Sequence, residues 1–392
     1  MRNAVIVDVV RSASGRGKPG GALSGVHPID LLADVLRSLM ERNEIDPVLV
    51  DDVVGGCVSQ ASEQAGNITR AASLAAGLPE STPATTVTRA CGSSQQAVQF
   101  AAQGVVAGAY DVVIACGVES MSRVPMGTAS MGHDLVGTGL AQRYPEGWIS
   151  QGVAAELVAR KYGLTRDDVD AYAAQSHGRA AASAAAGHFD REIVPVTTPD
   201  GLHTVDETIR AGTTTEGLGG LRPSFYSAES EARFPDLGWM ITPGNSSPLT
   251  DAAAATLIMS EEKAIALGLT PRARVVDFTV AGDDPVIMLT APIPATRKLL
   301  DRTGLTIDAV DVYEVNEAFA SVPLAWARAF DADPSRLNPA GGAISLGHAI
   351  GASGVRLLAT MVGELERTDG RYGLQTMCEH GGMANALLIE RI

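Results

Sequence analysis

The sequence predicts an α/β fold built from two similar halves, and three observations support this class. Continuous Val- and Ile-rich runs alternate with amphipathic stretches through residues 3–119, a pattern typical of a parallel-rich sheet covered by helices on both faces. The same order of elements returns in residues 272–392. At 392 residues, the chain also exceeds the size at which one hydrophobic core keeps growing, so two or three domains are expected.

Each element of the first half follows from its apolar pattern. We expect strands at 3–10, 50–58, 85–90 and 111–119, helices at 29–43 and 65–78, and a further helix directly after residue 91. The Gly- and Met-rich stretch 121–150 has no sustained period and is expected to be an ordered loop excursion. Helices are predicted over 153–164 and 165–187, the second with Thr165 as its N-cap, and residues 196–245 are expected to be irregular.

In the second half, the pattern predicts strands at 272–282, 310–318, 371–378 and 385–392 and helices at 292–304, 321–330 and 350–367. Segments 45–56 and 307–317 correspond, because each follows a helix and leads into a strand. A duplicated fold usually places its site where the halves meet, so we expect the functional residues there.

Composition excludes several classes of function. The net charge is −15, with 30 basic and 45 acidic residues, which disfavours nucleic-acid binding. The four cysteines form no CxxC pair and no histidine lies at zinc-ligand spacing, so neither a disulfide framework nor a metal is expected. No secretory signal or membrane-spanning run is found, and we expect a cytoplasmic protein with reduced thiols.

Cys91 is the first candidate catalytic residue. A β-branched run breaks at this cysteine, and a helical stretch follows it, with Gly92, Ser93 and Ser94 leaving room for a substrate carbonyl. A helix N-terminus favours thiolate over thiol, so we expect a lowered pKa and a nucleophilic sulfur. From this segment alone, packing in an apolar core is an equal alternative, and core packing is the expected role of Cys57 and Cys116.

A nucleophilic cysteine needs a base, which is usually a histidine. Of seven histidines, only His348 and His380 lie in loops bounded by glycine. The sequence around His348 is Gly-His-Ala-Ile-Gly-Ala-Ser-Gly, which lacks the register of a dinucleotide fingerprint and the ending of a P-loop. Further blocks start at Asn316 (Asn-Glu-Ala-Phe-Ala) and at Cys378 (Cys-Glu-His-Gly-Gly), each after a predicted strand.

Taken in order, these four blocks resemble the catalytic blocks of the thiolase family, the acyl-CoA C-acyltransferases. GVESMS at 117–122, PGNSSPLTDAAAA at 243–255 and MLTAPIPAT at 288–296 extend the resemblance over nearly the whole chain. It implies a duplicated αβαβα layered fold with a loop domain inserted in the N-terminal half. The implied domains are 1–120 with 246–268, the loop domain 121–245, and 269–392.

The resemblance implies a role for each residue. Cys91 would be acylated, His348 would activate it, and Cys378 would exchange a proton with the substrate α-carbon. Asn316, through a water, and His348 would stabilise the thioester oxygen as an enolate. The backbone N–H groups of Cys91 and His380 would form a second oxyanion site.

The resemblance also implies coenzyme A as co-substrate, with no tightly bound cofactor. Ser247 resembles the serine that contacts the pantetheine arm, and Arg222 a basic residue near the adenine end. Phe319 and Met288 would line the acyl tunnel, unless they are ordinary core residues. Gln151 stands where short-chain members commonly have methionine, which points to a polar acyl chain.

Two further positions depart from the family pattern. His380 replaces a glycine of the CxGGGxG block, so its imidazole would tune Cys378 or meet a polar acyl group. Ala349 replaces the proline of the usual GHP block, which loosens the loop but leaves the base in place.

The predicted function is thiolytic cleavage of a 3-oxoacyl-CoA, of polar, steroid-derived or dicarboxylic chain. The alternatives are biosynthetic condensation of two acetyl-CoA molecules and a thiolase-like subunit without catalysis. A homodimer or homotetramer is implied, with 121–150 as a candidate assembly loop.

Overall fold

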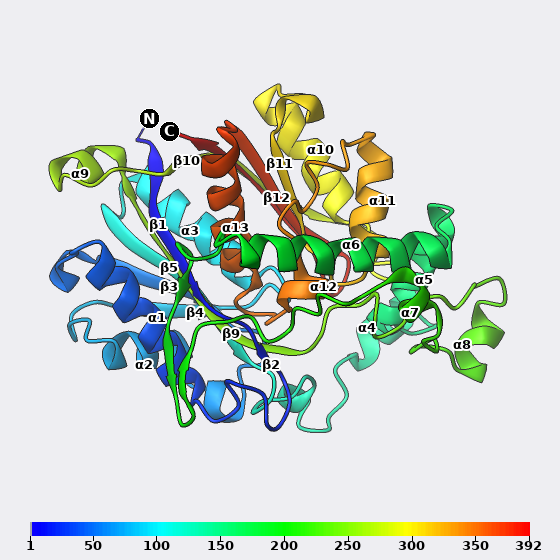
Figure 1. The fold of residues 1–392 in the computed structure, drawn as a ribbon. Helices are drawn as coiled ribbons and strands as arrows, with labels where there is room; N and C mark the ends of the chain where they lie inside the picture. The colour runs from blue at the N-terminus through cyan, green and yellow to red at the C-terminus, as the bar shows by residue number, and fades with distance from the viewer. Residues whose placement is uncertain (1) are drawn as a thin grey trace.

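The structure is a computed structural model, and it describes residues 2–392 (Figure 1). Most of its strands belong to one large mixed sheet, and helices cover both faces. The strands are β1 (Ala4–Ser12), β2 (Gly15–Arg16), β3 (Asp52–Gly56), β4 (Ala84–Val87), β5 (Val112–Ser120), β6 (Ile193–Val194), β7 (Val196–Thr198), β8 (Gly201–His203), β9 (Thr250–Ser260), β10 (Ala273–Gly282), β11 (Val312–Val315), β12 (Tyr372–Glu379) and β13 (Met383–Arg391).

The α-helices alternate with these strands in the first and last parts of the chain. They are α1 (Pro28–Arg42), α2 (Ile68–Ala75), α3 (Ser93–Ala107), α4 (Gly137–Arg143), α5 (Gln151–Lys161), α6 (Arg166–Ala185), α7 (Thr215–Gly219), α8 (Ala228–Arg233), α9 (Glu261–Ala266), α10 (Pro292–Thr303), α11 (Ser321–Phe330), α12 (Ala343–Leu346) and α13 (Ser353–Thr368). No helix among residues 2–392 is long and apolar enough to cross a bilayer.

The sheet has two halves with the same construction. One half runs β4-β3-β5-β9-β1 and the other runs β11-β12-β13-β10, and they join where β1 pairs antiparallel with β10. In each half the outer strands are parallel, and the two strands nearest the junction run antiparallel to their neighbours. The repeated order of elements predicted from the sequence is therefore a repeat of topology.

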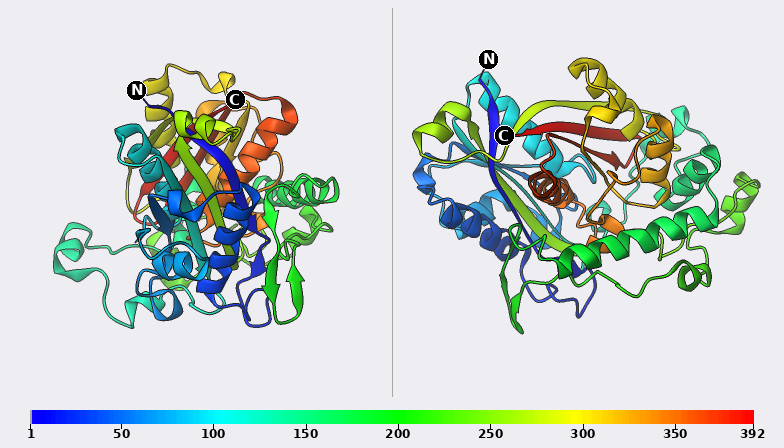
Figure 2. Two further views of the ribbon diagram at one scale, coloured as in Figure 1. Left: turned by 90° about the vertical axis from the view of Figure 1, so that its left-hand side faces the viewer. Right: turned by 45° about the horizontal axis from the view of Figure 1, so that its top comes forward.

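Helices form three layers around the two halves of the sheet (Figure 2). Helices α1 and α2 pack on the outer face of the first half, and α10 and α11 on the outer face of the second. Helices α3 and α13 share a hydrophobic core with strands of both halves, so they form the middle layer. This is the αβαβα layering expected from the resemblance.

One strand differs from the elements expected from the sequence, and the difference has a physical cause. Strand β9 was not predicted, because its alanine-rich sequence lacks the β-branched residues that mark strands. It is nevertheless buried along its whole length between β1 and β5, where small side chains fit.

The irregular stretch 196–245 contains the hairpin β7–β8 and the short helices α7 and α8. Thr165 does cap α6, in a capping box with Asp168.

Candidate active site

Cys91 lies in a tight turn between β4 and α3. Ala90, just before it, has a φ of +44°, a conformation that non-glycine residues rarely adopt. Ser93 stabilises this turn, because its hydroxyl accepts from the N–H of Arg89 at 2.9 Å and donates to the carbonyl of Ala90 at 2.6 Å. This backbone conformation places Cys91 in the wall of a cavity, although the cysteine side chain is largely buried.

The expected lowering of the Cys91 pKa is wrong. Burial raises the pKa of this thiol to about 12, and the nearby carboxylate of Glu379 raises it further. The first helical residue is Ser93, with Gly92 as N-cap, so the cysteine precedes the helix. Because the free thiol keeps its proton, reaction at the sulfur requires a base.

His348 is held on three sides. Its backbone N–H donates to the hydroxyl of Thr250 at 3.0 Å, its Nδ1 lies 2.7 Å from the hydroxyl of Ser353, and its Nε2 lies 3.4 Å from Nδ2 of Asn316. Burial lowers the imidazole pKa to about 3, and the guanidinium of Arg356 contributes in the same direction. The ring is therefore neutral at physiological pH and has one nitrogen free to accept a proton.

Asn316 directly follows β11, and its backbone N–H donates to the carbonyl of Thr376 at 3.0 Å. Its Oδ1 is buried and has no hydrogen-bond partner within residues 2–392. The next residue, Glu317, anchors the loop, because its carboxylate accepts from Tyr172 at 2.9 Å and from Ser176 at 2.8 Å. Asn316 thus has a fixed backbone and an amide oxygen still able to accept.

Cys378 is the second-last residue of β12 and is 1% exposed. It packs with Met288 and Phe319. Burial raises the pKa of its thiol well above the ordinary value, and the proximity of Cys91 raises it further. The effect of Cys91 on this pKa indicates that the two thiols lie near each other.

A cavity of about 510 Å³ opens over Cys91, with a mostly apolar wall from both halves of the fold and the intervening segment. Sequence-predicted residues in this wall are Cys91, His348, His380, Gln151, Ser247 and Phe319. Met288 is not part of the wall; it is fully buried and belongs to the same core cluster as Phe319. Arg222 is exposed and lies outside the wall. Phe319 is stacked edge-to-face on Phe225 at a centroid distance of 5.9 Å.

His380 enters this cavity without straining the chain. The positive φ angles of its block fall on Gly381 and Gly382, at +85° and +77°, so residue 380 does not need to be glycine. Its ring packs on Trp148 with a centroid distance of 5.3 Å, and partial burial lowers its pKa. Trp148 was not foreseen, since a lone tryptophan in an irregular segment gives no sequence signal.

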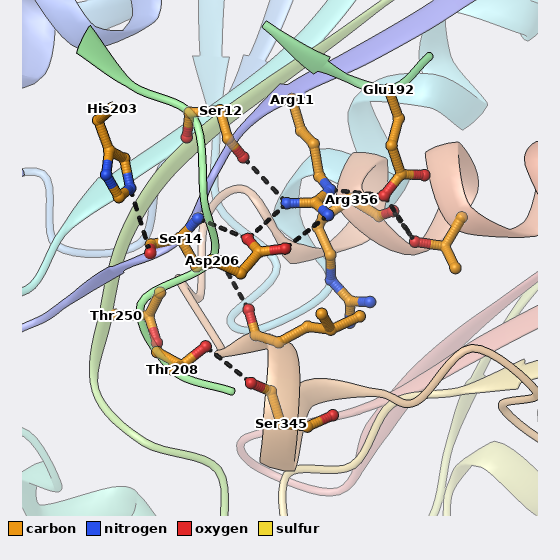
Figure 3. Close-up of polar contacts among 12 residues, drawn as sticks. Arg11, Ser12, Ser14, Glu192, His203, Asp206, Thr208, Thr250, Ser345 and Arg356 are labelled. Atoms are coloured by element: carbon orange, nitrogen blue, oxygen red, sulfur yellow. Dashed lines mark hydrogen bonds and ion pairs between the residues drawn. The ribbon is translucent and has the colours of Figure 1, made fainter. Parts of the chain in front are cut away.

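A buried ionic cluster around Arg11 is hydrogen-bonded to the chain just before His348. Figure 3 shows this cluster. Arg11 binds Glu192 through Nε at 2.7 Å and Asp206 through both terminal nitrogens at 2.7 and 2.9 Å. Asp206 also accepts from the N–H of Ser14, whose hydroxyl donates to the carbonyl of Leu346 at 2.6 Å. The cluster thereby connects the segment after α6 to Leu346, the last residue of α12, two residues before His348.

Cys91 and the neutral His348 line a mostly apolar cavity, and Asn316 and Cys378 are buried beside them without reaching its wall. On a duplicated αβαβα fold, these residue types are those of an acyltransferase that works through a cysteine. Comparisons with known proteins agree. The thiolase N-terminal domain matches residues 4–262, and the thiolase C-terminal domain matches residues 269–391. The chain belongs to the thiolase family.

Individual relatives extend this result. A steroid 3-ketoacyl-CoA thiolase, FadA6 of Mycobacterium tuberculosis, is 47% identical over all of this chain and 95% of its own length. A 3-ketoacyl-CoA thiolase of Aliivibrio salmonicida is 43% identical over the full length of both chains. The crystal structure of the Bacillus anthracis acetyl-CoA acetyltransferase has a TM-score of 0.89 and 36% identity, covering 100% of this chain and 99% of that chain. The predicted fold class, family and enzyme class are confirmed: the protein is an acyl-CoA C-acyltransferase.

Proposed function

We propose that the protein cleaves a 3-oxoacyl-CoA by thiolysis, with Cys91 as the acyl carrier. The observation that carries this proposal is the opening of Cys91 and His348 into one cavity, with Asn316 beside the imidazole and Cys378 near the thiol. Coenzyme A is the co-substrate, and no tightly bound cofactor takes part.

In the first half-reaction, the Cys91 sulfur bonds to the 3-keto carbon while its proton moves to His348 Nε2. The bond between C2 and C3 breaks, and its electron pair forms the enolate of the departing acyl-CoA. Cys378 gives its thiol proton to C2 of that enolate. In the second, the Cys378 thiolate takes the proton of CoA–SH, the CoA sulfur attacks the acyl group, and Cys91 leaves with the proton held by His348.

Negative charge develops on oxygen in both half-reactions. The thioester oxygen would accept hydrogen bonds from His348 and from a water oriented by Asn316. The oxygen of the acyl group on Cys91 would accept hydrogen bonds from the backbone N–H groups of Cys91 and His380. Each such donor contributes roughly 3–4 kcal/mol of transition-state stabilisation. The unpartnered Oδ1 of Asn316 supports a role in orienting water.

We further propose that the acyl chain carries a polar or carboxylate group. Gln151 and His380 bring an amide and an imidazole into a mostly apolar cavity, and a buried polar group needs a partner. The word steroid in the name of the FadA6 relative supports a bulky acyl chain. Ser247 and Arg222 are proposed for the pantetheine and adenine ends, with Phe319 and Met288 along the acyl chain.

Steady-state thiolysis of three substrates tests this choice: acetoacetyl-CoA, a plain medium-chain 3-oxoacyl-CoA, and its counterpart with a terminal carboxylate. We expect the carboxylated substrate to have the highest kcat/KM, and His380→Gly to remove that preference. His188→Gly, an exposed histidine outside the cavity, is the matched control. Activity on acetoacetyl-CoA alone would instead favour the biosynthetic acetyltransferase.

We propose the domain division 1–120 with 246–268, 121–245 and 269–392, and a homodimer or homotetramer. Strand β4 ends the sheet and pairs only with β3 among the described residues, and a free edge is suited to pairing with a second copy. Exposed Met131 and Leu135 support assembly through the 121–150 loop. Sedimentation equilibrium measures the number of chains in the assembly.

A cytoplasmic location is proposed because all four cysteines are free.

A further inference from the structure

We propose that Ser353 is a positioning residue that fixes the tautomer of His348, so that Nε2 meets the Cys91 thiol without a proton. The inference rests on the proposed role of His348 as the base. Ser353 is the first residue of α13 and is buried, one helical turn before Arg356.

The serine hydroxyl lies between two possible partners. Its oxygen is 2.7 Å from His348 Nδ1 and 2.9 Å from the carbonyl oxygen of Ala349. A carbonyl can only accept, and a hydroxyl has one proton. When that proton goes to Ala349, the serine oxygen is an acceptor toward His348, so Nδ1 must carry the ring proton.

The other side of the ring agrees with this direction. Asn316 Nδ2, a donor, lies 3.4 Å from Nε2, so Nε2 is placed to accept. The hydrogen bonds then run one way, from Asn316 through His348 and Ser353 to the Ala349 carbonyl, and each group has a partner of the opposite kind. The reverse tautomer would set two donors against each other at Nε2.

A tautomer matters only if the ring is neutral, and its surroundings hold it so. The imidazole is buried, and the Arg356 guanidinium makes no hydrogen bond within residues 2–392, so its charge is not paired directly. Arg356 also shares the wall of a small internal cavity with Ser353 and with Gly347 and Ala349, the neighbours of His348. Positive charge behind the ring opposes a second ring proton.

The choice of a hydroxyl as partner has a consequence for the chemistry. A carboxylate at this place would stabilise the imidazolium, as it does in serine-protease triads. A neutral hydroxyl orients the ring without holding the proton, so the imidazolium formed from Cys91 returns its proton readily when the sulfur leaves.

The test combines nitrogen NMR of ¹⁵N-histidine-labelled protein with kinetics. We expect His348 Nδ1 to be protonated and Nε2 unprotonated in the wild type, with the resonances assigned by His348→Asn. Ser353→Ala should populate the Nε2–H form and lower kcat by about 10- to 100-fold with little change in KM. Ser353→Thr keeps the hydroxyl and should restore both the tautomer and most of kcat.

Ser321→Ala is the matched control, because Ser321 is the buried first residue of α11 and its hydroxyl has no partner among the described residues. An Nε2–H tautomer in the wild type would overturn the inference, whether or not Ser353→Ala folds. So would an unchanged tautomer and kcat in folded Ser353→Ala. If substrate never acylates Cys91, the proposed function is wrong. The NMR measurement still tests the tautomer of His348, because it needs no substrate.

Discussion

Replacing Arg11 by methionine tests the energetic role of the buried ionic cluster around Arg11. Arg11 is fully buried, and the carboxylates of Glu192 and Asp206 are 6% and 1% exposed in their side chains. Three charged hydrogen bonds of 2.7 to 2.9 Å hold these groups together (Figure 3). Methionine fills similar volume but leaves two buried carboxylates without the cation that is hydrogen-bonded to them. Breaking a buried pair in this way costs about 3–5 kcal/mol.

Urea unfolding at pH 7, followed by circular dichroism, measures this loss as a lower midpoint. The matched control is Arg160→Met, which removes one exposed ion pair with Asp236, of 3.8 Å and 48% and 84% exposure. An exposed pair contributes about 0–1 kcal/mol. A midpoint for Arg11→Met no lower than that of Arg160→Met would refute the reasoning that the cluster is tightly coupled and desolvated.

Three further predictions concern the nucleophile and the pH dependence of stability. Gly92→Ala would place a Cβ 2.0 Å from Oε1 of Glu379, so we expect about 1–3 kcal/mol of destabilisation and a lower kcat; a midpoint and kcat equal to the wild type would contradict this close approach. Because burial raises the pKa of Cys91 to about 12, the rate of alkylation of Cys91 by iodoacetamide should rise about tenfold between pH 9 and 10. A rate that levels off between pH 9 and 10 would argue for an ordinary thiol, whose pKa is about 8.5. Burial lowers the pKa of His177 from 6.5 to about 4, so the unfolded chain binds a proton in this window that the folded chain does not, and stability should fall as the pH drops from 6.5 to 4. His177→Asn should reduce that fall in the urea midpoint, and an identical slope in the variant would exclude this histidine as a contributor.

The fold was largely predictable because its strands and helices have strong patterns. The strand 3–10 and the helix 29–43 appear as β1 and α1, since a Val-rich run and an amphipathic repeat each fit one kind of element. Strand β9 was not predictable from pattern alone, because alanine gives no strand signal and the burial that selects it comes from neighbours distant in sequence.

The candidate site was predictable in its residues and less so in its electrostatics. The sequence motifs shared with the family identified Cys91 and His348 as candidates, and both residues line one cavity. The thiol pKa was predicted in the wrong direction, because burial by residues such as Ile350 and Met377 is a tertiary property. Ser353 lies in the same glycine-rich block as His348, but the sequence alone assigns it no role. Its role follows from the 2.7 Å contact between its hydroxyl and the imidazole.

In the proposed reaction, Cys91 carries the acyl group. Rapid quenching after mixing the enzyme with a 3-oxoacyl-CoA in the absence of free CoA, followed by peptide mass spectrometry, measures this directly. We expect to find the shortened acyl group on Cys91, released by added CoA and absent in Cys91→Ser. An acyl group on Cys378 instead, or product formation by Cys91→Ser at the wild-type rate, would contradict it.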